Sequence, residues 1–287
     1  MNSSATLLVE RDGSIAKLTL NRPDVGTAID LSLAKGLMKA AIDCDEDDSI
    51  GCVVLTGAGR FFCTGGDVGG FVSAGDAVPS FLKELTAYLH MAIARLARMQ
   101  KPLITAINGP AAGAGLSLAV LGDIALSARS AHFTPAYTGI GLSPDGGSTW
   151  LLPRLVGLRR AQEIVLTNKR LGADDAAELG LVTRAVDDEL LAEEVRAIVA
   201  QLGKSTTAAI GRTRNLLLSS LESSFETQME DEARAIAELS RTSQTRDRIQ
   251  AFVSKRNASP SHRKARYERI HCRGGPDCRW SPRRQTR

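Results

Sequence analysis

Two short apolar runs open the chain and predict a β-hairpin. They cover residues 6–9 and 15–20, and the RDGS sequence between them is a turn-forming cluster. Apolar residues then recur at helical spacing, at positions 31, 33, 37, 38, 41 and 42. We therefore expect an amphipathic helix there, with Asp30 or Ser32 at its N-cap.

The middle of the chain alternates between strand and helix patterns. Residues 50–56 form an uncharged, β-rich run, which is typical of a strand buried on both faces. Residues 80–99 repeat apolar side chains as a long amphipathic helix that ends at Lys101-Pro102. A strand, a buried helix and a strand are predicted next, at 103–107, 116–121 and 124–127. Crossover connections of this kind lay strands parallel, so the fold class is α/β.

Strand patterns stop near residue 190. Helical patterns then occupy roughly 190–202, 206–220 and 225–253. We expect a core over 1–190, a helical region over 191–257 that packs on it or on a neighbouring subunit, and a tail over 258–287. The tail has no apolar periodicity and is rich in Arg, Ser and Pro, so we expect it to be disordered.

Charge is unevenly distributed along the chain. Within 255–287, Lys and Arg outnumber Asp and Glu by nine, and the whole chain carries +4, which leaves −5 for residues 1–254. A nucleic-acid-binding core is therefore not indicated. The tail has two aromatic residues and no amphipathic helix, which favours a solvated extension over a nucleic-acid or membrane anchor.

Composition further narrows the class of protein. The 287 residues are 43% hydrophobic, enough for one large core or two modest ones. Five cysteines without a CxxC pair favour a reducing compartment and suggest no zinc site. No secretory signal is recognised, and the most apolar stretch, 116–128, is shorter than the ~20 residues of a membrane span. We expect a cytoplasmic protein without a membrane partner.

Glycines concentrate in two loops that each follow a predicted buried strand. The loops lie within 57–70 and 109–115, and neither matches a phosphate-binding motif. Tight turns and close helix packing would explain either loop alone. Two such loops together raise an alternative, because small residues let backbone N–H groups approach a ligand, and each loop could donate one N–H to the same oxyanion.

Three ordered segments make this pattern specific. FCTGGDV (62–68), KPLITAINGPAAGAGLSLAVLGDIALSA (101–128) and IGLSPDGGSTWLLPRLVG (140–157) resemble the enoyl-CoA hydratase/isomerase, or crotonase, superfamily. The resemblance covers most of 1–257. It implies a ββα spiral core with a C-terminal helical trimerisation region, homotrimers or hexamers, and an acyl-CoA thioester substrate. CoA would enter as part of the substrate, with no separate cofactor or metal.

The same resemblance implies an oxyanion hole formed by the backbone N–H groups of Gly66 and Ala114. An enolate oxygen needs such donors, because the α-proton of a thioester is weakly acidic. Asp67 is expected mainly to order its loop, and Arg22 and Arg60 are possible partners for CoA phosphates, although exposed arginines are more often only solvated. Substrate contacts are expected from Val25, Thr64, Asp67, Val68, Gly113, Ser117, Tyr137 and Pro144.

The two glutamates of the family's hydratases align with Ser117 and Tyr137, so both are missing. The remaining acid/base candidate is Asp145, in a PDGGSTWLLPR stretch similar to that of the ring-type isomerases of phenylacetyl-CoA catabolism. The alternative role for Asp145 is a helix N-cap for a helix over about 146–152. His90 and His132 have no carboxylate nearby in sequence and are interpreted as structural.

One carboxylate suffices for an isomerisation, since it can take a proton from one carbon and return it to another. The leading hypothesis is therefore an acyl-CoA isomerase in which Asp145 moves the proton. The alternatives are an enoyl-CoA hydratase with a single acid/base group and a non-catalytic acyl-CoA-binding protein. The sequence does not specify the acyl group, the pathway, or trimer against hexamer.

Overall fold

A computed structural model describes residues 5–258. The described residues fall into two units, which divide between Leu239 and Ser240. The predicted tail lies outside the described residues except for its first position. The partition at residue 190 stays a prediction. Within the described range, no helix has the length and apolar character that crossing a membrane requires.

A six-stranded sheet forms the centre of the first unit, in the order β1-β2-β3-β4-β6-β9. The predicted hairpin is confirmed, because β1 and β2 pair antiparallel and every other neighbouring pair is parallel. This confirms the α/β class. The strands are β1 (Leu7–Asp12), β2 (Ile15–Leu20), β3 (Cys52–Gly57), β4 (Leu103–Ile107), β6 (Ile124–Ala128) and β9 (Arg184–Val186).

A smaller sheet has three short strands that the sequence patterns did not predict. They are β5 (Ala111–Ala112), β7 (His132–Thr134) and β8 (Leu171–Gly172), in the order β5-β7-β8. Strand β5 lies inside the second glycine-rich loop and pairs in parallel with β7. Two- and three-residue strands are too short to give a periodicity that could be detected.

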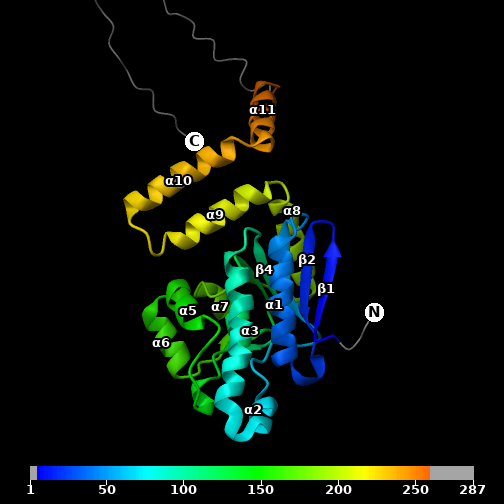
Figure 1. Cartoon of the computed structure of the whole chain (residues 1–287), viewed down its shortest axis with the longest axis vertical. Coiled ribbons are helices and arrows are strands. Elements are labelled where there is room, and N and C mark those ends of the chain that lie inside the picture. Colours follow the sequence, from blue (N-terminus) through cyan, green and yellow to red (C-terminus); the bar gives the residue numbers. More distant parts are fainter. Residues whose placement is uncertain (1–4, 259–287) are drawn as a thin grey trace, which may run out of the picture. The chain divides into compact units, whose positions relative to one another are not determined.

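Two long helices cover one face of the large sheet, α1 (Leu31–Glu46) and α3 (Val78–Arg98), which pack side by side (Figure 1). The predicted cap is confirmed, because the Leu33 N–H donates to Asp30 Oδ1 at 2.7 Å. The main hydrophobic core lies between these helices and the sheet, where Leu18, Leu37 and Leu89 are almost fully buried. Helix α8 (Leu191–Leu202) packs a second apolar cluster against β3 and β4.

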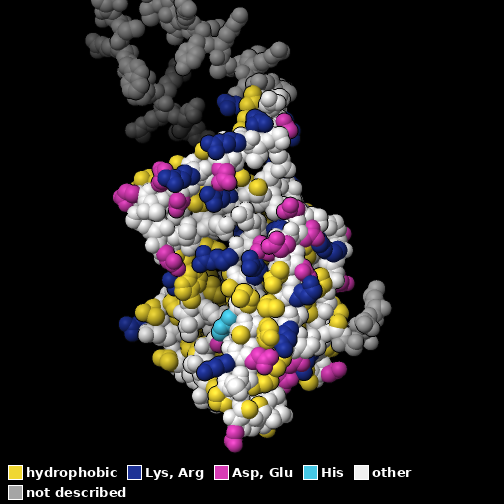
Figure 2. All heavy atoms as spheres, in the orientation of Figure 1, with side chains coloured by type: hydrophobic (Ala, Val, Ile, Leu, Met, Phe, Trp, Pro, Cys, Tyr) yellow, Lys and Arg dark blue, Asp and Glu magenta, His cyan; other side chains and the backbone are white. Residues whose placement is uncertain are grey.

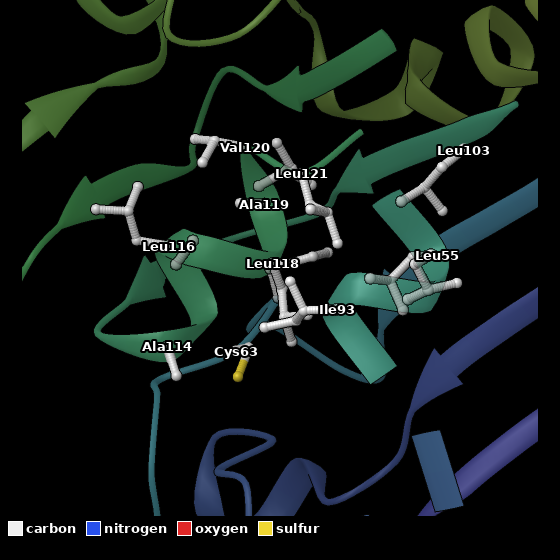
Figure 3. Packing of buried hydrophobic residues seen from close by; sticks show 14 of the residues in the cluster. Leu55, Cys63, Ile93, Leu103, Ala114, Leu116, Leu118, Ala119, Val120 and Leu121 are labelled. Atoms are coloured by element: carbon white, nitrogen blue, oxygen red, sulfur yellow. The ribbon is translucent and has the colours of Figure 1, made fainter. Parts of the chain in front are cut away.

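Helix α4 (Ala114–Ala119) is buried at every residue. Figure 3 shows its side chains among those of Leu55, Ile93 and Leu103, with Ala114 and Cys63 close together at its start. Four shorter helices complete the part before residue 190: α2 (Val68–Ala74), α5 (Ser148–Val156), α6 (Leu158–Leu166) and α7 (Ala173–Glu178). Single 3-10 turns occupy Pro23–Val25, Gly75–Ala77, Thr138–Ile140 and Asp188–Leu190.

After residue 190 the described chain contains helices and no strand, as predicted. Helix α9 (Thr207–Ser219) is anchored by buried Arg214, whose guanidinium pairs with Asp123 at 2.6 Å. The prediction of a single helix over 225–253 is wrong, because the chain forms two helices there, α10 (Phe225–Ser240) and α11 (Ser243–Ala258). The second of these begins after Thr242, whose hydroxyl accepts from the Thr245 N–H and so caps a new helix.

Candidate functional site

A cavity of about 380 Å³ lies where the two glycine-rich loops meet α2, α3 and the segment before α5. Its wall is mostly apolar, with Phe71, Leu85 and Leu89 among its larger side chains. The polar side chains in the wall are Thr64, Thr86, Tyr137, Ser143 and Asp145. Among these described wall residues, Asp145 carries the one carboxylate. On the face in Figure 2, hydrophobic side chains are also exposed along α3 and over α5 and α6.

The two glycine-rich loops are locked together by backbone contacts. Cys63 forms a parallel bridge with Ala111, and the Ala112 N–H donates to the Cys63 carbonyl at 2.9 Å. Glycine is required at position 115, because a Cβ there would lie 2.0 Å from the Cys63 carbonyl oxygen. The first loop and the start of α4 therefore have a fixed relative position.

Two backbone amides on these loops face the cavity region without an internal partner. The Ile29 N–H donates to the Gly65 carbonyl, and the Asp67 N–H donates to the Ile29 carbonyl. The backbone on both sides of Gly66 is therefore hydrogen-bonded toward Ile29. Because N–H and C=O groups alternate in direction along an extended segment, the Gly66 N–H points away from Ile29. Ala114 is the first residue of α4, where helical N–H groups are unpaired. No acceptor for either N–H is found among the described residues.

Asp145 lies in a tight turn that precedes α5. The next residue, Gly146, has φ +62° and packs so closely on Ser117 that a Cβ would approach its side chain to 2.9 Å. The Ser117 hydroxyl donates to the Asp145 carbonyl oxygen at 3.0 Å. The N-cap alternative is wrong, because α5 begins at Ser148, its N-cap is Gly147, and no side chain caps it. The Asp145 carboxylate is therefore available to the cavity.

Tyr137 holds one oxygen of this carboxylate. Its hydroxyl donates a hydrogen bond to Asp145 Oδ1. The preceding residue, Ala136, adopts φ +62°, an uncommon conformation for a residue with a Cβ, and this fixes where Tyr137 enters the cavity wall. Burial, together with the negative charge of Asp145, raises the pKa of the Tyr137 phenol well above its usual value. The phenol thus stays protonated as a donor.

We expect this raised pKa of Tyr137 to be visible in a spectrophotometric titration. Between about pH 9 and pH 11, where an ordinary tyrosine ionises, the tyrosinate absorbance of the folded protein should be the same for the wild type and Tyr137→Phe. The unfolded chains serve as the control, because there the two titrations should differ by one tyrosine. A lower amplitude in folded Tyr137→Phe would show that Tyr137 ionises normally.

The interpretation of His90 as structural stays a prediction, but the residue contacts Asp145 although it is not in the cavity wall. Helix α3 places it beside the second carboxylate oxygen, with His90 Nε2 3.4 Å from Asp145 Oδ2. The Gly146 N–H also donates to the same nitrogen at 3.1 Å. Its helical spacing from Thr86 and Leu82, which line the cavity, is the signal that could have found it. His132 contacts Arg170 instead, at 3.1 Å, away from this cluster.

The remaining predicted site residues divide into two groups. Seven line the cavity: Thr64, Gly66, Val68, Gly113, Ala114, Tyr137 and Asp145. Val25, Asp67, Ser117 and Pro144 are not in its wall. Val25 is half exposed, whereas Ser117 is fully buried and contacts Asp145 from behind. Their predicted contacts with substrate stay predictions.

Asp67 orders its loop, as expected. Its side chain accepts from the Gly70 N–H at the start of α2 and pairs with Arg22 at 2.9 Å. Arg22 also approaches Asp30 at 3.4 Å and donates to the Ala28 carbonyl. The guanidinium predicted to bind a CoA phosphate thus already has three protein partners. Arg60 lies over the ring of Phe61.

Comparisons with known proteins identify the family of this chain. A model of the enoyl-CoA hydratase/isomerase family matches residues 10–262. A 1,2-epoxyphenylacetyl-CoA isomerase of Escherichia coli is 35% identical over 88% of this chain and 96% of its own length. A 4-chlorobenzoyl coenzyme A dehalogenase of Arthrobacter is 35% identical over 82% and 86%. The crystal structure of an enoyl-CoA hydratase from Polaromonas superposes with a TM-score of 0.83 at 28% identity, covering 87% and 97%. The chain therefore belongs to the enoyl-CoA hydratase/isomerase family.

Proposed function

We propose that this enzyme is an acyl-CoA isomerase that moves a double bond or rearranges a ring through a thioester enolate. The observation that carries the proposal is a single carboxylate, Asp145, in the wall of a cavity that also has the unpaired N–H groups of Gly66 and Ala114. The family's hydratases use two glutamates. Here the aligned positions hold Ser117 and Tyr137, and both donate a hydrogen bond to Asp145.

The proposed reaction needs three groups of this chain. The N–H groups of Gly66 and Ala114 donate to the thioester oxygen while it gains negative charge, and one such donor is typically worth ~3–4 kcal/mol in the transition state. Asp145 takes the α-proton, and the proton returns at another carbon. The proposal requires no metal or redox cofactor, because the isomerisation has no net oxidation and the named groups hold the oxyanion and move the proton; CoA is part of the substrate. We also propose a homotrimer or hexamer, following the family resemblance.

The substrate test distinguishes isomerase from hydratase. We expect 3-enoyl-CoA to be converted to the conjugated 2-enoyl-CoA, seen as a rise of the enoyl-thioester absorbance, and ring-containing acyl-CoA esters to give isomers of unchanged mass. Crotonyl-CoA should keep its absorbance, because an enzyme with one carboxylate adds water poorly. Loss of that absorbance would support the hydratase instead. Tight binding of esters without turnover would support the non-catalytic alternative.

His90 favours a second candidate, displacement of a halogen from an aromatic acyl-CoA. A carboxylate can attack an electron-poor ring carbon and release halide. An imidazole beside it, once released from the Gly146 N–H, can activate the water that hydrolyses the resulting ester. His90 Nε2 lies 3.4 Å from Asp145 Oδ2, and one relative is named a 4-chlorobenzoyl coenzyme A dehalogenase. Chloride release from 4-chlorobenzoyl-CoA tests this candidate, and absence of release rejects it.

A further inference from the structure

The Tyr137 hydroxyl occupies a position that the isomerisation described above does not use. It lines the cavity, and it donates to Asp145 Oδ1. The other carboxylate oxygen, Oδ2, faces His90 and is not bonded to Tyr137. The phenol and the carboxylate therefore form two adjacent proton-carrying groups in the wall of the same cavity.

We propose that Tyr137 is a second catalytic residue, which delivers the proton to the new carbon after Asp145 has removed the α-proton. This inference rests on the proposed isomerase function and assigns its protonation step. It extends the role of Tyr137 from a substrate contact to a proton donor. A straight-chain 3-enoyl-CoA is the substrate class for which the step can be followed.

The step balances in protons and charge. Asp145 Oδ2 takes a proton from C2, and the electrons of that C–H bond form the dienolate, whose oxygen the two backbone amides hold. The phenol then gives its proton to C4, and the electrons of the dienolate form the C4–H bond and the conjugated double bond. The carboxyl group of Asp145 then turns its O–H toward Tyr137 and gives the proton to the phenolate. Both side chains return to their starting states, and no other reactant is consumed.

Electrostatic coupling between the two groups favours this order. The negative charge of Asp145 is one cause of the raised pKa of Tyr137, after burial. When Asp145 becomes protonated, that charge disappears, and its oxygen becomes a weaker hydrogen-bond acceptor. The phenol is therefore a better proton donor once the dienolate has formed than it is before. The phenolate that results is strongly basic in the buried cavity and is quickly reprotonated by its neighbour.

The fate of a deuterium label tests the relay. A 3-enoyl-CoA carrying two deuterium atoms at C2 is converted in ordinary water with enzyme in excess, so that each active site turns over once. The relay predicts that the product keeps one deuterium, because Tyr137 supplies protium to C4. In Tyr137→Phe, Asp145 itself must deliver to C4 the deuteron that it removed from C2. A large share of the product should therefore keep both deuterium atoms. Mass spectrometry of the acyl-CoA measures the difference.

The rate provides a second readout. General acid catalysis contributes about 100-fold or more, and Asp145 can still return the proton, so we expect turnover by Tyr137→Phe to fall by about that lower figure. Tyr88→Phe is the matched control, since Tyr88 is not in the cavity wall. Retention of both deuterium atoms by the wild type overturns the relay and needs no variant. An identical label pattern in folded Tyr137→Phe overturns it as well.

Failure of the relay can be distinguished from failure of the proposed isomerase function. If the wild type converts no 3-enoyl-CoA, the isomerase proposal fails and the relay with it. If the wild type isomerises and the product keeps both labels, the relay alone fails, and Asp145 acts without Tyr137. Should Tyr137→Phe not fold, which its circular dichroism would reveal, a wild-type product that keeps both deuterium atoms still overturns the relay.

Discussion

Asp145→Asn is expected to lower the turnover of 3-enoyl-CoA by about 10³–10⁴-fold, near the upper end of what general acid–base catalysis contributes. The reason is that an amide has nearly the shape of the carboxylate but does not accept the α-proton. The variant should fold, since the side-chain oxygen still accepts from Tyr137 and the backbone carbonyl still accepts from Ser117. Steady-state kinetics and thermal unfolding should be measured together.

A matched control for Asp145→Asn is Asp174→Asn. Asp174 is an exposed carboxylate on α7 that pairs with Arg129 at the surface. We expect its removal to leave turnover unchanged, because an exposed ion pair contributes little to stability and the residue is not in the cavity wall. Wild-type turnover by folded Asp145→Asn would remove Asp145 from the reaction.

Ala114→Pro is expected to lower turnover by about 10²–10³-fold, the cost of losing one oxyanion donor. Proline removes the N–H without breaking a hydrogen bond of the fold, because Ala114 is the first residue of α4 and, in the described chain, its N–H has no internal acceptor. Proline is well tolerated at that helical position. We therefore expect a small change in the melting temperature.

Ala114→Gly controls for the side chain, because it removes the methyl group and keeps the N–H. Its turnover should stay within a few-fold of the wild type if the backbone donor is what matters. Equal losses in the Pro and Gly variants would instead point to the shape of the cavity. Wild-type turnover in the Pro variant would exclude the Ala114 N–H as an oxyanion donor.

Local patterns predicted much of the fold. The hairpin followed from a turn-forming cluster between two apolar runs, and Asp30 was recognised because a carboxylate before an apolar helical stretch satisfies the first free N–H groups. Small residues after buried strands likewise indicated the two loops that hold Gly66 and Ala114. These features depend on neighbours within a few residues, which a sequence displays directly.

The features that the sequence patterns did not predict depend on contacts between separate segments of the chain. His90 and Asp145 are separated by 55 positions, and only the packing of α3 against the turn before α5 brings them together. The start of α5 was placed too early, because Gly146 and Gly147 both adopt positive φ and delay the helix to Ser148. The roles of Ser117 and Tyr137 were likewise hidden, since each acts on Asp145 through a tertiary hydrogen bond.

The interlocked loops separate two properties of the cavity that usually change together. The N–H groups of Gly66 and Ala114 belong to the main chain, and their positions are set by the bridge between Cys63 and Ala111. Part of the apolar wall is supplied instead by side chains of α3, such as Leu85 and Leu89. Exchanging those side chains alters the room for an acyl group and leaves the amides in place. We therefore expect substitutions in this part of the wall to change which acyl groups fit, without moving the two backbone amides.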